Sequence, residues 1–353
     1  MKPIRAAMVT PLTGPLAMYG RVAGEATRLW TEELAESESV VLTLHDAHPD
    51  PVSAVRRAEA SRPDVLFGPY GRGPALAVAR ATSRLVWNGG GATARLAAPE
   101  FENVVNIPAP AASYFRGGLA AIRDVDATVG SVVVVHSGKG FSGEVARGAV
   151  SAAEQTGVTC AEVLFRPGHG GESLSRVTGG DVLAMVGSFR DELEMARAVK
   201  RRRWRAVMSV AAGVDEVLEA LGDRREGLLG PAQWTPGAAP RPDLGPDADW
   251  FVSAYHRRFG ASPPYPAVQA VAAAVIWSEC VRVAGTLDEG ALLAQARRLD
   301  VRTLYGAFRI DPVTGLQVGH RVVTVQWQDG IRRVVWPPHR AEAPLRLIQR
   351  TWP

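Results

Sequence analysis

The sequence predicts an α/β protein made of two doubly wound parallel-sheet lobes joined by a three-strand hinge. Three observations support this fold class. The chain has 353 residues, which is too long for one ordinary hydrophobic core. Short apolar stretches alternate with amphipathic helical stretches from residue 4 to about residue 234. A Pro- and Gly-rich segment, 235–247, then separates this region from a tail of helices and strands.

The alternation begins near the start of the chain and continues with little interruption. Parallel strands need a crossover connection, so this pattern is typical of βαβ units. The expected strands are 4–9, 39–45, 64–67, 84–87, 131–136, 158–165, 181–186, 206–210 and 227–233. The expected helices between them are 20–36, 51–61, 74–83, 111–123, 141–156, 189–202 and 213–221.

Several helix boundaries carry explicit signals. Asp50 followed by Pro51 predicts an N-cap and a proline at the first helical position. Gly73-Pro74 suggests a second start of this kind. Gly157 and Gly260 are expected helix C-caps, because glycine adopts the left-handed conformation that ends many helices.

The tail begins with helices and ends with strands. Its second expected helix, 266–284, is apolar nearly all round, which predicts burial against a sheet. Residues 305–336 alternate as strands, with a turn at Asp311–Gly315 and a tight Asp329-Gly330 hairpin. The expected helices are 248–259, 266–284 and 288–298.

The chain therefore builds one lobe, then a second, and then returns to complete both. Lobe one is expected to hold residues 1–118 and about 236–318, and lobe two residues 119–235 and about 319–353. Repeated crossings between lobes would form a hinge. Ligands of open α/β sheets bind beyond the carboxyl ends of the strands, so a ligand cleft is expected between the two lobes.

Composition excludes several partners. The net charge is +4, and lysine occurs only at Lys2, Lys139 and Lys200, so arginine supplies most positive charge. These charges are scattered rather than gathered on one face, so no nucleic-acid partner is expected. No run of about 18 apolar residues occurs, so no membrane span is expected. Cys160 and Cys280 lie far apart and are expected to be buried free thiols.

The start of the sequence leaves two locations open. Met1-Lys2-Pro3 leads directly into the first expected strand, with no export signal before it. The expected location is extracytoplasmic, at the cell surface or in the periplasm, if an export signal was removed. Otherwise it is cytoplasmic.

Three fragments resemble chemical motifs but do not complete them. His45-x-x-His48 has neither the helical zinc spacing nor an EF-hand pattern, and the neighbouring acids are expected to end a strand and cap a helix. Gly138-Lys139-Gly140 lacks the rest of a phosphate-binding loop. His136 and Ser137 are adjacent in a strand and point to opposite faces. The sequence therefore predicts no catalytic residue, no metal and no cofactor.

Several short segments carry a resemblance to a known family. After the first strand, Thr13-Gly14-Pro15 precedes the aromatic–glycine pair Tyr19-Gly20. Further segments follow in register, namely His45–Pro51, Phe67–Gly71, Trp87–Ala92, Phe141–Gly143 and Tyr305–Gly315. Their order and spacing resemble the branched-chain amino-acid (leucine-binding-like) family, the type I periplasmic binding proteins of ABC transporters.

The resemblance implies a type I periplasmic-binding-protein fold whose lobes close on a small solute and pass it to an ABC permease. The solute is expected to be an amino acid or a related amide, acid or aromatic compound. Two alternatives remain open. One is a cytoplasmic regulator similar to amide sensors of the same fold, which would signal to a partner protein. The other is an enzyme on a doubly wound scaffold, which the missing motifs disfavour.

The resemblance and the strand-end positions together select candidate ligand-binding residues. Glycine-rich loops allow close backbone approach, and aromatic residues line solute pockets. Arg72 and Asn88 are the polar groups available where the family places hydroxyls. The candidates are Tyr19, Tyr70, Gly71, Arg72, Asn88, Gly90, Gly91, Phe141, Phe189, Ala212 and Trp234.

One position departs from the family. Amino-acid binders carry an acid at about Ala212 that pairs with the ligand ammonium, and here the residue is alanine. Asp215 is close by and is expected to cap the following helix. Phe141 and Phe189 also replace tyrosines. Because a buried ammonium without a partner is costly, we expect a less zwitterionic solute that is aromatic or acidic.

Overall fold

The computed structural model describes residues 3–33 and 39–349 and divides the chain into two compact units. The first unit contains Met1–Pro110 and Trp234–Arg321, and the second contains Ala111–Gln233 and Val322–Pro353. The chain therefore crosses three times between the units. The first crossing precedes helix α4 (Arg116–Val125), whereas the boundary expected after residue 118 would cut that helix.

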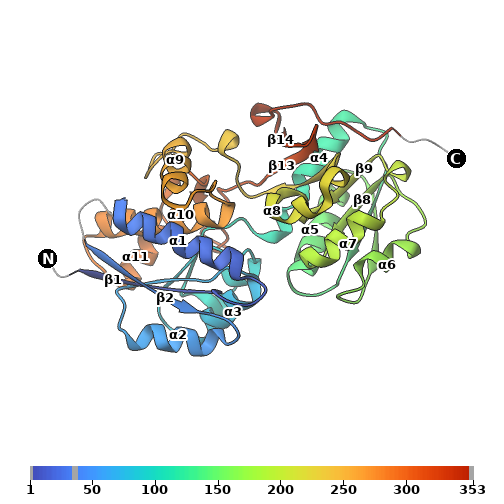
Figure 1. Cartoon of the computed structure of the whole chain (residues 1–353). Helices are drawn as coiled ribbons and strands as arrows, with labels where there is room; N and C mark the ends of the chain where they lie inside the picture. Colours follow the sequence, from blue (N-terminus) through green and yellow to red (C-terminus); the bar gives the residue numbers. More distant parts are fainter. Residues whose placement is uncertain (1–2, 34–38, 350–353) are drawn as a thin grey trace. The chain divides into compact units, whose positions relative to one another are not determined.

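The first unit is built on a parallel five-stranded sheet. Its strand order is β2-β1-β3-β4-β5. Helix α2 lies on the opposite side of β1 and β2 from α1 (Figure 1). The strands are β1 (Ile4–Thr10), β2 (Val40–Asp46), β3 (Val65–Phe67), β4 (Val86–Asn88) and β5 (Val104–Asn106). The helices are α1 (Ala17–Glu33), α2 (Pro51–Ala60), α3 (Arg72–Ala81), α9 (Ala248–Phe259), α10 (Tyr265–Ala284) and α11 (Glu289–Ala296).

Strand β1 shows why this unit has two hydrophobic cores. Successive side chains of a strand point to opposite faces. Ala6 and Met8 enter the core that contains residues of α1 and α10, whereas Ala7 and Val9 enter the core under α2 and α3. From Ala6 to Val9 the strand is buried on both faces, which explains the continuous apolar run in the sequence.

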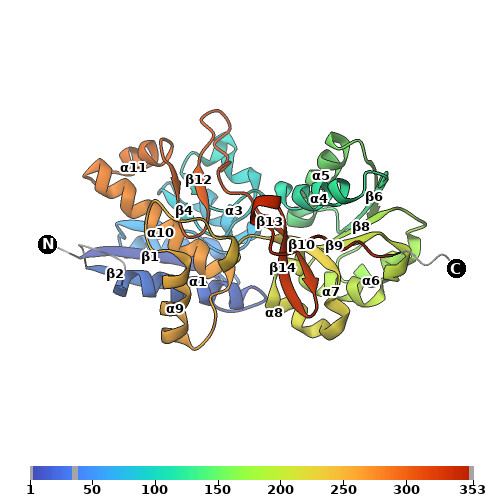
Figure 2. The same cartoon turned by 90° about the horizontal axis from the view of Figure 1, so that it is seen from above.

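The second unit is a mixed seven-stranded sheet. The order is β14-β13-β10-β9-β8-β6-β7, in which the last five strands are parallel and the hairpin β13–β14 is antiparallel (Figure 2). The strands are β6 (Ser131–His136), β7 (Thr159–Leu164), β8 (Val182–Val186), β9 (Ala206–Ser209), β10 (Leu228–Ala232), β13 (Val323–Gln328) and β14 (Ile331–Trp336). The helices are α4, α5 (Gly140–Gln155), α6 (Gly170–Ser173), α7 (Phe189–Ala198) and α8 (Asp215–Leu218).

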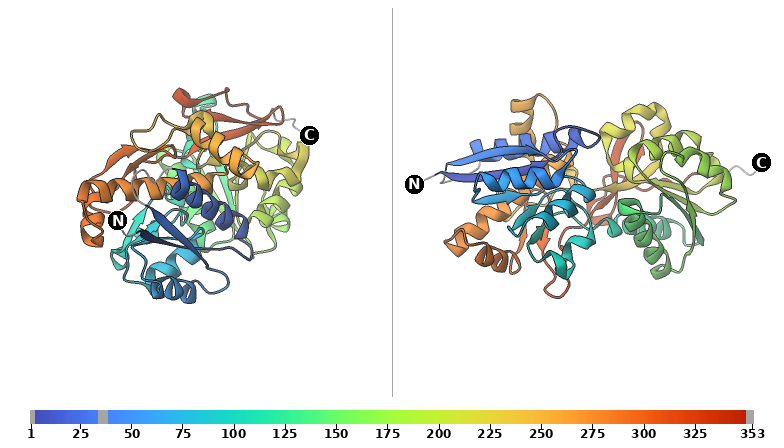
Figure 3. Two further views of the ribbon diagram at one scale, coloured as in Figure 1. Left: turned by 60° about the vertical axis from the view of Figure 1, so that its left-hand side comes forward. Right: turned by 90° about the horizontal axis from the view of Figure 1, so that it is seen from below.

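The return segment brings residues far apart in sequence into one core. In the first unit, α10 packs along α1, and Trp277 of α10 meets Trp30 of α1 edge to face at 5.9 Å. The blue and orange segments lie side by side in both views of Figure 3. A separate two-stranded sheet pairs β11 (Asp300–Arg302) with β12 (Ala307–Arg309).

Helix α10 is long and apolar enough to cross a membrane, by length and composition alone. In the first unit it serves as a core helix, and 67% of its most apolar window is buried. Its first two thirds contribute a nearly continuous series of buried residues from Pro266 to Trp277. Burial on all sides explains the all-round apolar pattern of the sequence.

The fold class is confirmed, and several capping predictions are confirmed with it. Asp50 caps α2 by accepting hydrogen bonds from the amides of Val52 and Ser53. Gly260 ends α9 in the left-handed conformation. Asp329 and Gly330 both have positive φ between β13 and β14, as a type I′ hairpin requires.

Other boundaries were predicted wrongly. Helix α3 begins at Arg72, because Gly71 takes a positive φ and acts as the N-cap. The helix expected over 213–221 is α-helical only over Asp215–Leu218, and Gly222 breaks the 3₁₀ segment that follows. Helix α7 ends at Ala198. Strands β5 and β11 were missed. Each has three residues, and only one of the three in β11 is apolar. The end of the helix expected over 20–36 falls outside the described residues.

Both cysteines are free, as expected, although only Cys280 is fully buried. Burial, followed by the nearby Glu162 and Glu154 carboxylates, raises the pKa of Cys160 to about 11. Burial and then Glu279 raise the pKa of Cys280 to about 12. Thiols with such pKa values are poor nucleophiles at neutral pH.

Candidate functional site

In the first unit, every candidate residue except Trp234 follows one of three neighbouring strands. Tyr19 comes after β1, Tyr70 to Arg72 after β3, and Asn88 to Gly91 after β4. Strands β1, β3 and β4 are adjacent and parallel. Their carboxyl ends therefore meet at one edge of the sheet, which places these loops together.

The loop after β1 is anchored by Asp46 at the end of β2. The Asp46 carboxylate accepts hydrogen bonds from the amides of Leu12 (2.8 Å) and His48 (3.0 Å) and from the Thr13 hydroxyl (2.6 Å). Slight burial raises the pKa of Asp46, but the Thr13 hydroxyl and these amides outweigh it and lower the pKa to about 2. Asp46 thus holds the loop that precedes Tyr19.

Tyrosines form an aromatic cluster at this edge. The rings of Tyr19 and Tyr70 are stacked, with centroids 4.7 Å apart and planes 19° apart. The Tyr70 hydroxyl is hydrogen-bonded to the hydroxyl of Tyr265 at the start of α10. Tyr265 was not predicted, since nothing in its local sequence distinguishes it from a helix-start residue.

Asn88 organises the loop after β4. Its side-chain oxygen accepts from the amide of Gly91 (2.8 Å), and its side-chain NH₂ donates to Asn106 (2.8 Å) and to the Gly91 carbonyl (3.0 Å). Asn88 is 1% exposed. Both ends of the Asn88 amide therefore shape the loop.

Close packing explains the glycines of these loops. A β-carbon on Gly90 would lie 2.7 Å from the Tyr70 Cα, and one on Gly91 would lie 2.3 Å from the Ala75 Cβ of α3. The Gly71 amide donates to the Gly90 carbonyl, which joins the loops after β3 and β4. Arg72, half-buried, is the first residue of α3.

In the second unit, Phe141, Phe189 and Ala212 follow β6, β8 and β9, which are adjacent parallel strands. Phe141 is half-buried and contacts Tyr114 edge to face at 5.6 Å. Phe189 is the first residue of α7 and is also half-buried. The same edge of this sheet therefore gathers all three candidates.

Ala212 lies in a tightly packed loop. It is fully buried, and its carbonyl accepts a hydrogen bond from the Trp327 indole at 3.0 Å. A β-carbon on Gly230 of β10 would approach the Ala212 Cβ to 2.8 Å. Position 230 therefore requires glycine beside Ala212. Asp215 does not cap a helix as predicted, because its carboxylate pairs with Arg332 at 2.9 Å.

Trp234 belongs to the first unit and is part of its hydrophobic core. The residue is 6% exposed, and its indole N–H donates to the Leu304 carbonyl at 2.9 Å. Trp234 therefore has a packing role in the core of the first unit. Its role in ligand binding stays a prediction.

A buried acid that the sequence did not reveal lies at the same edge as Phe189 and Ala212. Glu192, in the first turn of α7, is 1% exposed and accepts hydrogen bonds from the Ser209 hydroxyl and the amides of Ala211 and Gly187. Burial raises its pKa to about 7, although these hydrogen bonds lower it. Acidic residues are common in the first turn of a helix, where they interact favourably with the helix dipole. The sequence around Glu192 therefore predicts an acid of this kind rather than a buried one.

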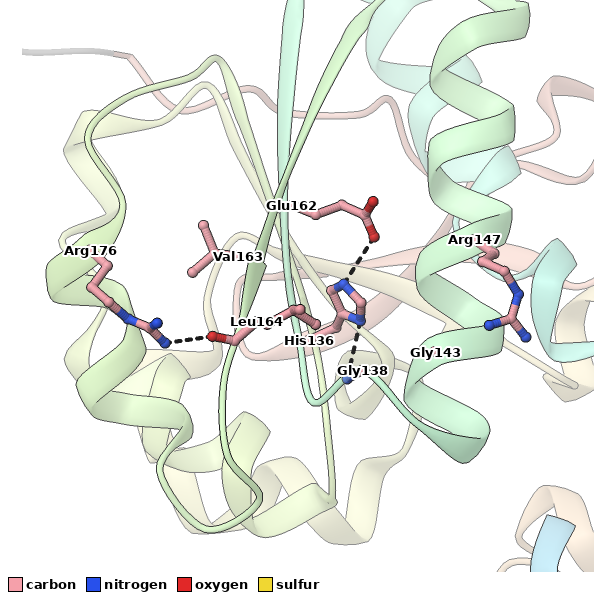
Figure 4. Close-up of a pocket in the computed structure, with 8 residues that line it drawn as sticks. All are labelled: His136, Gly138, Gly143, Arg147, Glu162, Val163, Leu164 and Arg176. Carbon is pink, nitrogen blue, oxygen red and sulfur yellow. Dashed lines mark hydrogen bonds and ion pairs between the residues drawn. The ribbon is translucent and has the colours of Figure 1, made fainter.

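A separate open pocket of about 520 Å³ lies within the second unit, at the ends of β6 and β7 (Figure 4). The buried His136 accepts from the Gly138 amide at 3.2 Å through Nδ1, and its Nε2 lies 3.0 Å from Glu162. Arg176 donates to the Leu164 carbonyl at 2.6 Å. The pocket contains none of the predicted ligand-binding residues.

The acids near His45 and His48 serve structural roles. Asp46 anchors the first loop and Asp50 caps α2, as the sequence predicted. Burial and the nearby Arg57 lower the pKa of His45. Across residues 3–33 and 39–349, no group of three or more histidine, cysteine or acidic side chains could hold a metal ion.

Comparison with known proteins gives one family match and many structural relatives. The sequence model of the family described as "Periplasmic binding protein" matches residues 3–331. A leucine-binding protein from Thermotoga maritima is 19% identical, with a TM-score of 0.78 over 94% of this chain and 97% of that one.

Two further structures were solved with ligands. A solute-binding protein of an ABC transporter from R. palustris, in complex with benzoate, is 16% identical, with a TM-score of 0.75 over 94% of this chain and 95% of that one. A branched-chain amino-acid binding protein from Streptococcus pneumoniae, in complex with isoleucine, is 12% identical, with a TM-score of 0.75 over 95% and 100% of the two chains. At these identities the similarity establishes the fold.

Proposed function

Because this chain belongs to the periplasmic binding protein family, we propose that it binds a small organic solute and delivers it to the permease of an ABC transporter. The family consists of binding proteins, so the chain is not an enzyme. In this proposal the strand-end loops of both units hold the solute. Closure follows from differential affinity, because the solute makes its full set of contacts only when both sets of loops engage it.

One observation carries the proposal. Each unit places candidate residues at the carboxyl edge of three adjacent parallel strands, β1, β3 and β4 in the first and β6, β8 and β9 in the second. That edge is where open α/β sheets bind ligands. The same arrangement recurs in both units, so each has a ligand-binding edge of this kind.

The side chains favour an aromatic carboxylic acid over an α-amino acid. An ammonium group needs a carboxylate partner when it is desolvated. At the loop after β9, Ala212 offers none, the Glu192 carboxylate accepts three internal hydrogen bonds, and Asp215 pairs with Arg332. An amino-acid ligand would leave its charge unpaired there.

Aromatic residues and a helix start supply the complementary features. The stacked Tyr19–Tyr70 pair and the half-buried Phe141 and Phe189 offer ring faces to a planar solute. The first turn of α3, with Arg72, suits a carboxylate through its guanidinium and the helix dipole. The benzoate complex of the R. palustris relative fits the same chemistry.

A thermal-shift screen followed by calorimetric titration tests this assignment. We expect benzoate and hydroxybenzoates to raise the melting temperature, and leucine and isoleucine to leave it unchanged. A solute at 100 times its Kd stabilises the folded state by about 2.7 kcal/mol. Stabilisation by branched-chain amino acids alone would overturn the aromatic-acid assignment. No shift with any small solute would overturn the binding function.

Phe189→Ala is expected to weaken solute binding about tenfold or more, because it removes an aromatic face at the strand-end edge. The measurement is the Kd of benzoate by calorimetry. Phe259→Ala is the matched control, since Phe259 is also half-buried but lies at the end of α9, where its ring is tilted against that of Tyr255. Equal affinity in both variants would remove Phe189 from the site.

A further inference from the structure

Glu192 joins two loops of the second unit that would otherwise be separate. One carboxylate oxygen accepts from the Gly187 amide at 3.2 Å, after β8. The other accepts from the Ala211 amide at 2.7 Å and from the Ser209 hydroxyl, after β9. The side chain enters from α7, which packs against both β8 and the segment Val210–Gly213. One carboxylate thus connects three elements.

This arrangement is costly unless all three donors are used. A buried carboxylate loses its hydration, and accepted hydrogen bonds must offset that loss. The amide donors in turn need an acceptor. Ala211 is 1% exposed, and a buried N–H without an acceptor is unfavourable. An apolar side chain at position 192 would leave both amides without this acceptor. The acid therefore fixes the backbone of both loops at once.

The loops held in this way carry two candidate ligand-binding residues. Gly187 lies two residues before Phe189, and Ala211 directly precedes Ala212. Glu192 itself is buried beneath them, so it does not present its carboxylate to a solute. Its effect on binding would pass through the backbone geometry of the loops.

The neighbouring acid performs a different task. Asp191 is equally buried and accepts from the Gly168 amide at 2.8 Å, after β7, and from the Ser188 hydroxyl at 2.7 Å. It therefore fastens the loop after β7 and completes the capping box of α7. Glu192 alone of the two acids reaches the loop after β9.

We propose that Glu192 is a positioning residue for solute binding, whose carboxylate sets the spacing between the loop at Gly187–Phe189 and the loop at Ser209–Ala212. This inference rests on the proposed function, because its consequence for affinity requires that these loops contact the solute. The coupling of the loops themselves is independent of any ligand. Both parts can be measured separately.

Glu192→Gln is the principal variant. It keeps the shape of the side chain but replaces one acceptor oxygen with an NH₂ group, which must face an N–H or O–H donor. We expect the Gly187 or Ala211 amide to exchange hydrogen at least tenfold faster, while the amides of β6 keep their protection. We also expect the Kd of benzoate to rise at least tenfold.

Met195→Ala is the matched control. Met195 is fully buried on the same helix, one turn later, and its truncation costs stability without removing a hydrogen bond to either loop. It should leave the exchange of Gly187 and Ala211 and the Kd within about threefold of the wild type. If Met195→Ala changes both as much as Glu192→Gln does, Glu192 acts only through overall stability and the proposal is wrong.

Ser209→Ala covers the case in which Glu192→Gln does not fold. It removes one donor and leaves the carboxylate in place, and it should raise both the exchange rate of Ala211 and the Kd of benzoate about threefold. Unchanged exchange and unchanged affinity in this variant would overturn the proposal. If wild-type protein does not bind benzoate, the aromatic-acid assignment fails, while the exchange rates still decide whether Glu192 couples the loops.

Discussion

Asn88 and Asp46 both stand at strand ends, where polar residues are usual candidates for ligand contact. In this protein each side chain accepts hydrogen bonds from nearby backbone amides, Asn88 from Gly91 and Asp46 from Leu12 and Thr13. The sequence can place such a residue at a strand end. It cannot tell whether the side chain turns inward to its own loop, because that depends on backbone groups set by the fold.

Glu192 gives the clearest pH dependence at the residue scale. Burial raises its pKa from 4.5 to about 7 in the folded protein. Between these values the unfolded chain releases the proton first, so the folded state loses stability as pH rises. We expect the free energy of unfolding of the wild type, relative to Glu192→Gln, to fall by on the order of 2 kcal/mol from pH 5 to pH 8.

Urea denaturation at pH 5, 6.5 and 8 measures this difference. Most of the loss should be complete by pH 7.5, because Glu192 is then largely ionised in both states. Parallel pH profiles for the wild type and Glu192→Gln would show that the folded protein does not retain this proton.

At the scale of elements, local patterns predicted long segments better than short ones. The helix expected over 248–259 agrees with α9, and the strand expected over 131–136 agrees with β6. Both have strong patterns and clear ends. Strand β5 has only three residues and is formed through its pairing with β4, so its sequence carries little signal.

In the candidate site, likewise, the positions of residues along the chain could be predicted, but the contacts between elements could not. The order of strands and helices was enough to place Tyr19, Tyr70 and Phe189 after their strands. The Tyr70–Tyr265 hydrogen bond and the Glu192 contacts join residues from different elements. Such contacts depend on packing, and no single local pattern contains them.

The glycine loop after β4 offers a prediction at this scale. Gly91→Ala would place its β-carbon 2.3 Å from the Ala75 Cβ, so α3 must shift away from the loop. We expect a loss of stability of about 2 kcal/mol or more. Gly73→Ala is the control, because its β-carbon meets nothing within 4 Å and alanine is the better helix former. Urea denaturation of the two variants provides the comparison, and equal stability would contradict the close approach.

At the scale of the whole molecule, each unit has a sheet and a core of its own, and the chain passes between them three times. In the first unit, Trp277 of α10 meets Trp30 of α1 and Phe67 of β3 edge to face. The core therefore depends on both chain segments of that unit. We therefore expect each unit to unfold as a separate cooperative structure.

Trp277→Ala is expected to destabilise the first unit selectively, by about 3–5 kcal/mol, because it leaves a large cavity beside Trp30. Hydrogen exchange should accelerate in β1 and β4 and remain unchanged in β6 and β8. Val134→Ala, in the core of β6, should give the opposite distribution. If both variants accelerate exchange throughout the chain, the two units unfold as one.

The split of the first unit also has a consequence for synthesis on the ribosome. Helix α1 ends at Glu33, whereas its packing partner α10 begins only at Tyr265. At ordinary elongation rates the nascent chain waits on the order of tens of seconds between the two. During that interval Trp30 has no Trp277 to cover it, whereas β6 to β10 emerge as one uninterrupted stretch. The five parallel strands of the second unit can therefore pair before α10 reaches α1, although the hairpin β13–β14 that completes their sheet emerges last. For that whole interval the apolar face of the N-terminal segment lacks its native partner.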